Sequence, residues 1–264
     1  MYDGINKATM GMLAMNMKQD VILNNLANVG TSGYRKENMV FSSFSDIMAK
    51  EMNQGRPRNP MSKSNEMQQA SVGYESNGAL YTRSTTSFEQ GSLKNTGNQF
   101  DLALDDNGRS FFTIQGKNGL TFTRSGSFRL DNAGYLVTAD GSNVMGHNGK
   151  IKLNGTSFEV ANDGSVKVDG KTIDKLLITE FDPNMSNRGL QHDGSNNFAS
   201  YGQGRVATDA SVKQGFLEMA NVNAVQSMVD LMNIMRAYEA NQKTLQAEDK
   251  MIQKTVSETG RAKG

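Results

Sequence analysis

The chain has 264 residues with 28 Lys and Arg against 27 Asp and Glu, which gives a net charge of +1. Because the charges balance and no run of like charges occurs, the composition does not support binding to nucleic acid. The absence of cysteine excludes disulfides, thiolate metal sites and a cysteine nucleophile. No segment approaches the ~20 consecutive apolar residues that a membrane-spanning helix needs.

The N-terminal segment predicts a helix that begins near Asp3, a helix-capping residue, and ends within 24–30, where Asn and Gly accumulate. Its apolar residues follow the four-and-three spacing of a helix seam. The seam consists of Ile5, Ala8, Met12, Met15, Ile22, Leu26 and Val29, with Gln19 as the one polar member.

The same segment lacks the pattern of a cleaved signal peptide. Asp3, Lys7, Lys18 and Asp20 interrupt any apolar core, and no small-residue cleavage site follows one. We therefore expect that the protein, if it leaves the cytoplasm, uses a route other than a cleaved signal.

The middle of the chain changes from a polar arm to β-type sequence. Residues 41–90 contain few apolar clusters and two prolines, Pro57 and Pro60, and are read as an extended arm that allows a short helix at 44–52. Strands are predicted at 111–115, 120–123, 127–130, 135–138, 157–160, 165–168 and 176–181. Residues 184–204 read as loop, and 215–218 as a brief extended piece.

Asn-Gly and Asp-Gly pairs separate these strands, and such pairs accept the positive φ angles of tight hairpin turns. They occur at 107–108, 118–119, 140–141, 148–149, 154–155, 163–164 and 169–170. The pattern predicts an antiparallel sheet or a barrel-like domain.

The C-terminal segment predicts a second helix over 223–256, which would be roughly 50 Å long. Gln242 and Asp249 interrupt its apolar seam. That seam consists of Ala224, Met228, Leu231, Met235, Tyr238, Leu245, Ile252 and Val256.

We therefore expect an α+β fold in which long N- and C-terminal helices pair as a coiled-coil-like unit, with an antiparallel β-rich domain inserted between them. The expected division is a discontinuous helical assembly domain at 1–40 and 216–264, an extended arm or linker at 41–90, and a β-rich domain at 91–215.

Several motifs resemble those of the bacterial flagellar rod and hook proteins, in the order that the family has them. They are DVILNNLANV at 20–29, TSGY at 31–34, GSL at 91–93, TGN at 96–98, DLAL at 101–104, FTRSGSF at 122–128, GYLVT at 134–138, GFLE at 215–218, NV at 221–222 and RAYEAN at 236–241. Two positions depart from the family: Ser110 replaces the second Gly of Gly-x-Gly-Phe-Phe, and Ala220 replaces the Ser before Asn-Val.

The resemblance implies a structural subunit of the flagellar rod, of distal-rod or proximal-rod type, that self-assembles into a helical tube and supports motility. A hook or hook-associated subunit is the alternative. The implied partners are further copies of the chain, neighbouring rod and hook proteins, the flagellar type III export apparatus and the surrounding basal-body rings. The implied location is the periplasmic axial rod of the basal body.

Residues of both seams and of the motifs at their ends are the predicted subunit interface. They are Ile5, Met12, Met15, Ile22, Asn24, Asn25, Leu26, Asn28, Met228, Leu231, Met235, Tyr238, Glu239, Asn241, Leu245 and Ile252. Two readings of the Asn cluster at 24–28 stay open: the amides end the helix, or they bridge to the backbone of an adjacent subunit. Tyr238 and Glu239 equally allow packing within the chain.

A secreted hydrolase is the remote alternative, with Asp101 paired with Asp105 or Asp131. These acids lie in turn-forming strings, and neither Gly-x-Ser-x-Gly nor His-Glu-x-x-His occurs. The strings at 105–108 and 131–134 also lack the spacing of a calcium loop. We expect no catalytic residue, cofactor, metal site or small-molecule substrate.

Overall fold

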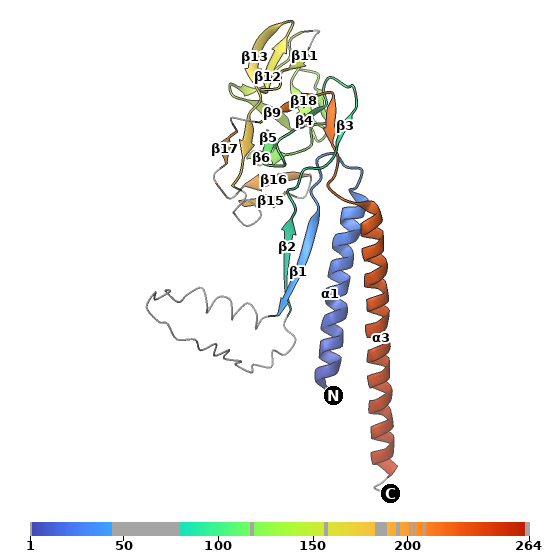
Figure 1. Cartoon of the computed structure of the whole chain (residues 1–264). Coiled ribbons are helices and arrows are strands. Elements are labelled where there is room, and N and C mark those ends of the chain that lie inside the picture. The colour runs from blue at the N-terminus through green and yellow to red at the C-terminus, as the bar shows by residue number, and fades with distance from the viewer. Residues whose placement is uncertain are drawn as a thin grey trace, which may run out of the picture. The chain divides into compact units, whose positions relative to one another are not determined.

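The computed structural model describes residues 2–43, 80–116, 119–155, 158–182, 189–193, 196–200, 202, 204–207 and 210–261 (Figure 1). Most of the predicted arm and the short helix at 44–52 lie outside the described residues. The chain divides into two units. One comprises Met1–Leu23, Met39–Ser84 and Met228–Gly264, and the other comprises Asn24–Asn38 and Thr85–Ser227. The predicted boundaries at 40, 90 and 215 stay a prediction.

Two helices confirm the terminal helices expected from the sequence: α1 (Tyr2–Ala27) and α3 (Ala224–Arg261). At the end of α1, the Asn28 amide donates to the Asn24 carbonyl (3.0 Å), which gives a helix-end carbonyl a side-chain partner. At the start of α3, Asn223 Oδ1 accepts from the Gln226 backbone N–H (3.1 Å), the bond of an N-cap residue. Neither described helix is long and apolar enough to cross a membrane.

The predicted fold class is wrong. The described residues form two helices and many antiparallel strands, so the chain is largely β rather than a coiled-coil pair with an inserted domain. Within the described residues, the element pairs in extensive contact are all pairs of strands. The apolar seams misled because a helix repeats at 3.6 residues, and regular spacing does not show which side is covered. Met228 and Met235 of the predicted seam are 51% and 49% exposed.

Nineteen strands are described, and each is short. Their bounds are β1 (Glu37–Ser43), β2 (Leu80–Thr86), β3 (Leu93–Asn95), β4 (Leu102–Leu104), β5 (Ser110–Gly116), β6 (Gly119–Thr123), β7 (Phe128–Leu130), β8 (Leu136–Thr138), β9 (Asn143–Gly146), β10 (Gly149–Lys150), β11 (Phe158–Val160), β12 (Ser165–Val168), β13 (Lys171–Lys175), β14 (Ile178–Glu180), β15 (Leu190–His192), β16 (Asn197–Ser200), β17 (Arg205–Val206), β18 (Val212–Gln214) and β19 (Phe216–Glu218). Each predicted strand has a counterpart, but the expected loop at 184–204 contains β15 and β16, so that prediction is wrong in part.

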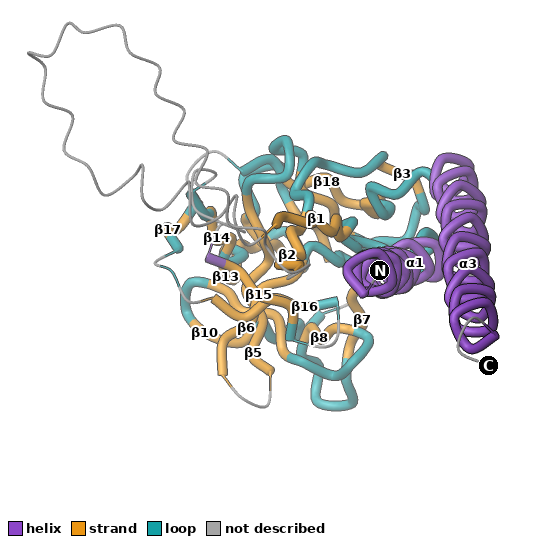
Figure 2. Tube along the Cα trace, turned by 90° about the horizontal axis from the view of Figure 1, so that it is seen from below, coloured by secondary structure: helices purple, strands orange, loops and turns teal. Residues whose placement is uncertain are grey.

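The main sheet contains ten strands, with the order β15-β16-β6-β5-β9-β8-β7 along its path. Off this path, β10 pairs with β9, while β14 pairs with both β5 and β17. A three-stranded sheet, β11-β12-β13, and the two-stranded sheets β18-β4, β19-β3 and β1-β2 complete the set. In Figure 2 the strands are orange, the loops that connect them are teal and the two helices are purple.

Strand β5 supplies both cores of the β-rich unit because successive side chains of a strand point to opposite faces. Phe112 and Ile114 enter a large aliphatic cluster that also holds Leu136 and Val144. Phe111 points the other way into a cluster of phenylalanines with Phe88, Phe181 and Phe198, whose rings meet mainly edge to face. The β-rich unit therefore has two hydrophobic cores, one on each face of β5.

The turn chemistry read from the sequence is confirmed for the hairpin at Asp169-Gly170, which joins the paired strands β12 and β13, whereas Asn107-Gly108 turns the chain between β4 and β5, which do not pair with each other. Asn107 and Asp169 are the two described non-glycine residues with positive φ, at 57° and 50°, and each precedes a glycine with positive φ. Such consecutive positive angles are those of a type I′ turn.

Candidate functional site

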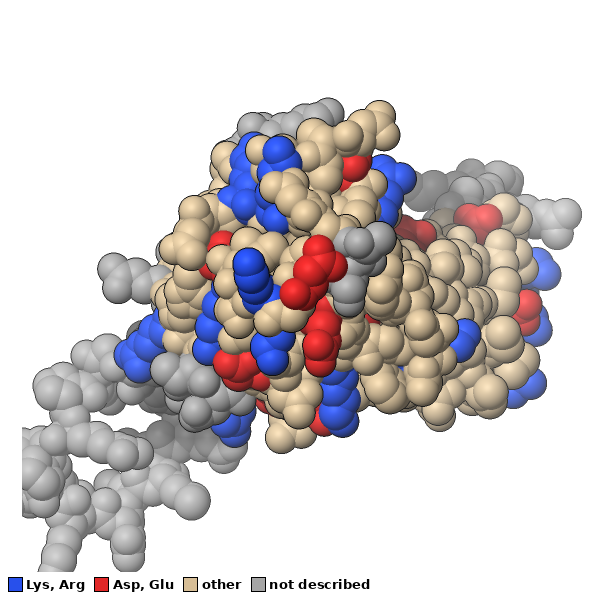
Figure 3. Space-filling view, turned by 90° about the horizontal axis from the view of Figure 1, so that it is seen from above, with Lys and Arg blue, Asp and Glu red and all other residues tan. Residues whose placement is uncertain are grey.

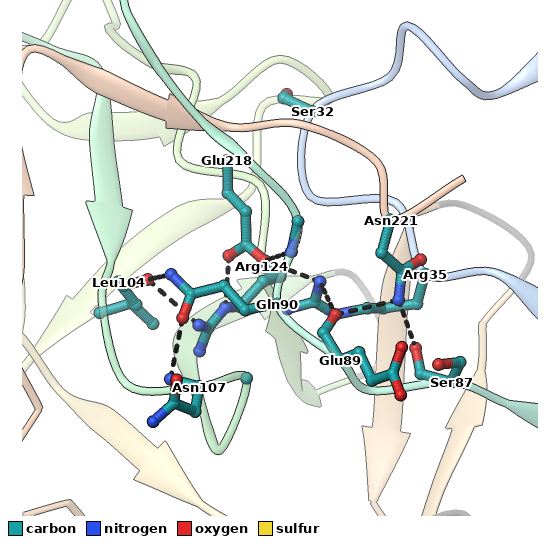
Figure 4. Close-up of polar contacts among 12 residues, drawn as sticks. Ser32, Arg35, Ser87, Glu89, Gln90, Leu104, Asn107, Arg124, Glu218 and Asn221 are labelled. Atoms are coloured by element: carbon teal, nitrogen blue, oxygen red, sulfur yellow. Dashed lines mark hydrogen bonds and ion pairs between the residues drawn. The ribbon is translucent and has the colours of Figure 1, made fainter. Parts of the chain in front are cut away.

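A buried cluster of charged side chains joins three distant stretches of sequence, and we call it the junction. It comprises Arg35 from the segment after α1, Asp106 and Arg124 from the β-rich region, and Glu218 at the end of β19. Figure 4 shows Arg35 and Arg124 on either side of Glu218. All four lie in the same unit. The junction therefore holds together the segment that follows α1 in the sequence and the segment that precedes α3.

Glu218 is the centre of the junction and is 1% exposed. Its Oε1 lies 2.7 Å from Arg35 Nη1, and its Oε2 lies 2.7 Å from Arg124 Nε. Oε1 also accepts from the Gly91 backbone N–H at 2.9 Å. One carboxylate therefore contacts two buried guanidinium groups and also holds a third chain segment, and Asp106 supplies the second negative charge.

Arg124 is fully buried and uses its whole guanidinium fork. Beyond Glu218, it bonds Asp106 Oδ1 through Nη2 (2.5 Å), the Leu104 carbonyl and the Ser110 carbonyl. Burial alone would lower the pKa of Arg124, but the charges of Glu218 and Asp106 outweigh it and hold that pKa above its ordinary value. Burial would likewise raise the pKa of Asp106, yet the bonds from Arg124 and Ser110 keep it below its usual range.

Arg35 is fully buried but less well matched. Its Nη1 donates to the Glu89 carbonyl (2.9 Å) as well as meeting Glu218, while within the described residues its Nε and Nη2 have no hydrogen-bond partner. Burial lowers the pKa of Arg35, and the nearby Glu218 offsets only part of that effect. The charge of Arg35 therefore depends on Glu218 for its balance.

Two asparagines fix the strand that follows Arg35 by pairing with its backbone. Asn25 at the end of α1 donates to the Glu37 carbonyl (2.8 Å) and accepts from the Glu37 N–H (2.9 Å), so it pairs as a neighbouring strand would. Asn221, just before α3, accepts from the Lys36 N–H (2.7 Å) and donates to the carbonyls of Ser87 and Glu89. Adjacent residues are thus held by amides from the two ends of the chain.

The structure places the predicted interface residues of α1 in differing surroundings. Asn25 is buried and its carbonyl oxygen is used within the chain, where it also accepts from Tyr34 Oη (3.1 Å). Ile22 is buried, and Asn24 is exposed. Met12, Met15, Leu26 and Asn28 are partly buried, and nothing is described of the Ile5 side chain. Their place in a subunit interface stays a prediction.

The predicted residues of α3 separate into two groups. Leu231, Tyr238, Asn241, Leu245 and Ile252 are partly buried, and Asn241 Nδ2 lies 3.5 Å from Met15 Sδ. Met228, Met235 and Glu239 are exposed. Ser227 and Ile234 of α3 are buried, although the predicted seam did not include them.

An exposed apolar stripe runs along the first three turns of α3, and we call it the Met/Val stripe. Its members share one face of the helix because they are spaced by three and four residues. They are Val225 (72% exposed), Met228 (51%), Val229 (39%), Met232 (51%) and Met235 (49%). The sequence reading included only two of them. Contiguous exposed apolar side chains of this kind mark interaction surfaces.

Charged side chains on the β-rich part are of mixed sign. In the face shown in Figure 3, Lys and Arg alternate with Asp and Glu among uncharged residues. No metal-binding group of His, Asp or Glu occurs among the described residues. The described residues thus present buried ion pairs and an exposed apolar helix face.

The comparisons with known proteins agree with this reading. The family model described as "Flagellar basal body rod FlgEFG protein C-terminal" matches residues 213–258, which include β19 and most of α3. A second model, "Flagellar hook protein FlgE/F/G D1 domain", matches residues 107–168. The flagellar basal-body rod protein FlgG of Bacillus subtilis (strain 168) is 32% identical over 274 residues, which cover 97% of each chain.

The chain belongs to the flagellar basal-body rod protein family. FlgG of Agrobacterium fabrum (strain C58 / ATCC 33970) is also 32% identical, over 92% of this chain and 94% of its own. The flagellar hook-basal body complex protein FlhO of Bacillus subtilis is 26% identical over 99% of this chain. These findings confirm the resemblance read from the motifs. The protein is a structural subunit of the flagellar rod and not an enzyme, and nothing favours the hook alternative over it.

Proposed function

We propose that this rod protein packs through its two helices against further copies of itself and against neighbouring rod and hook proteins, in a helical tube. The observation that supports this is the Met/Val stripe, because a stripe of five exposed apolar side chains is costly to leave in water. A head-to-tail contact that does not close into a ring propagates as a helix. The predicted interface residues of α1 and α3 would lie in these contacts.

The proposed location is the axial rod where it crosses the periplasm, within the surrounding basal-body rings. The route we propose is export in unfolded form through the flagellar type III apparatus, without a cleaved signal. Isolated helices are marginal in water because their nucleation is costly. We infer that α1 and α3 become fully ordered only when neighbouring subunits cover their apolar faces.

A single charge in the stripe tests the proposal. Val229→Glu places a carboxylate where the proposal puts an apolar subunit contact, while leaving the junction untouched. In a strain that lacks the native gene, we expect normal protein levels but few hook-basal bodies, because burying an unpaired carboxylate is strongly unfavourable.

The matched control is Thr244→Glu, which adds the same charge to an exposed position of α3 more than two turns beyond the stripe. Hook-basal bodies counted by electron microscopy are the readout, with swimming in soft agar beside it. Wild-type numbers in the Val229→Glu strain would refute the stripe as a subunit contact.

A further inference from the structure

Oxidation chemistry in this chain is concentrated on methionine. The sequence contains 17 methionines but no cysteine and no tryptophan. Cysteine thiolates, where present, compete for two-electron oxidants, and here that competition is absent. The thioether sulfurs are therefore the side-chain atoms that a peroxide would oxidise.

Exposure separates the methionines into two groups by location. The exposed methionines among the described residues are Met228, Met232, Met235 and Met251, at 51%, 51%, 49% and 61%, and all lie on α3. Those of α1, such as Met12 and Met15, are partly buried, as are Met145 and Met219 of the β-rich unit. Since susceptibility follows exposure, α3 should react first.

We propose that Met228, Met232 and Met235 form an oxidation site at which hydrogen peroxide blocks assembly of the free subunit. At each sulfur, one peroxide oxygen is transferred to the thioether as the O–O bond breaks, and the other oxygen leaves as water. Sulfur loses two electrons to become the sulfoxide, and the peroxide is reduced. No further reactant is needed.

The consequence for assembly follows from the place of these sulfurs, and it rests on the proposed function. All three lie in the Met/Val stripe, at positions 228, 232 and 235, so they face the same side of α3. A sulfoxide is a polar hydrogen-bond acceptor, and it converts an apolar contact into one that must bury an unsatisfied oxygen. Three sulfoxides would thus make it unfavourable to bury this face against an apolar neighbour, whereas three thioethers favour that burial.

The first test maps oxidation by mass spectrometry in the purified full-length chain and in isolated basal bodies, both treated with hydrogen peroxide. In the free chain we expect Met228, Met232 and Met235 to oxidise at least about threefold faster than Met145 and Met219. In basal bodies the same three should be protected. Equal rates for all methionines in the free chain, or no protection in basal bodies, would overturn the proposal.

The second test uses the variant M228L/M232L/M235L, which keeps size, apolar character and helix propensity but removes the oxidisable sulfurs. At a sublethal peroxide concentration that lowers the number of hook-basal bodies in wild-type cells, cells that express the variant should build more of them than wild type does. The control M251L changes an exposed methionine outside the stripe and should remain as sensitive as wild type.

Equal sensitivity of the triple variant and wild type would refute the oxidation site. A failure of the proposed function would look different, because the protein would then be missing from basal bodies even without peroxide.

Discussion

At the scale of single residues, Glu218 decides whether the junction is stable. It is the one carboxylate that contacts both Arg35 and Arg124 in the described structure. Removing one partner of a buried ion pair leaves an uncompensated charge, whereas an exposed pair contributes little. Loss of one junction partner is therefore expected to destabilise the fold strongly. This cost is that of a buried charge without a partner, and it does not measure the stability of the junction against apolar side chains in the same place.

Glu218→Gln keeps the shape of the side chain but leaves the two arginines with a single acid, Asp106. We expect the free energy of unfolding to fall by about 3–5 kcal/mol, measured by chemical denaturation. Glu159→Gln, at an exposed carboxylate of β11, is the control and should change it by less than about 0.5 kcal/mol. An unchanged midpoint for Glu218→Gln would show that the arginines do not need this acid.

The raised pKa of Tyr34 leads us to expect that the free energy of unfolding falls at alkaline pH. Burial, with a smaller contribution from Glu37, raises its pKa to about 12 from 10.0. Because the folded state holds the phenol proton more tightly than the unfolded state, the stabilising contribution is complete below pH 10 and is lost as pH rises toward 12.

The measurement is the unfolding free energy of wild type and Tyr34→Phe between pH 9 and 12. The difference between the two should shift steadily over the upper part of this range, since Phe has no proton to lose. Parallel curves would contradict the burial of the phenol.

At the scale of elements, the turn after α1 needs glycine at position 33 for two separate reasons. Gly33 has a φ of +68°, and a Cβ there would lie 2.3 Å from the Ser125 backbone nitrogen. Gly97 has a φ of +69° but nothing within 4 Å of a Cβ. The two positions share the backbone strain and differ in the close approach.

Gly97→Ala should therefore cost about 1 kcal/mol for its backbone angle, and Gly33→Ala should cost about 2 kcal/mol or more beyond that because overpacking displaces the chain. Thermal unfolding of both variants gives the comparison. Equal losses would mean that the segment 31–35 does not pack tightly against Ser125.

The elements also show how far the sequence could be read. Both helices and about half of the described strands of the β-rich unit were predicted, because local spacing and turn pairs such as 169–170 specify them, whereas short strands such as β15 and β16 carry no such local signal. The covered side of α3 was predicted in part: Leu231 and Tyr238 are partly buried as expected, while Ser227 and Ile234 are buried beside them. Ser227 was passed over as polar, yet its hydroxyl donates to the Asn223 carbonyl (2.9 Å) and so tolerates burial.

The junction could not be predicted from one sequence. Arg35, Arg124 and Glu218 are ordinary charged residues in their local context, and nothing in the spacing of one shows where the others lie. Their signal was present only indirectly, because all three fall within the family motifs or next to them. Pairing of distant charges is a property of the folded chain, whereas helix and turn signals are local.

At the scale of the whole molecule, the chain combines a β-rich unit that has two buried cores with a helix, α3, that leaves apolar side chains exposed. The chain belongs to the flagellar rod family, and under the proposed function these uncovered faces are the surfaces that neighbouring subunits cover. We therefore propose that assembly depends on the Met/Val stripe.

The most direct measurement is electron cryo-microscopy of basal bodies purified from the native cell. We expect density for this chain in the axial rod, with Val229 and Met232 covered by a neighbouring subunit. Absence of the chain from the rod and hook, or a stripe that faces solvent in the assembled rod, would contradict it.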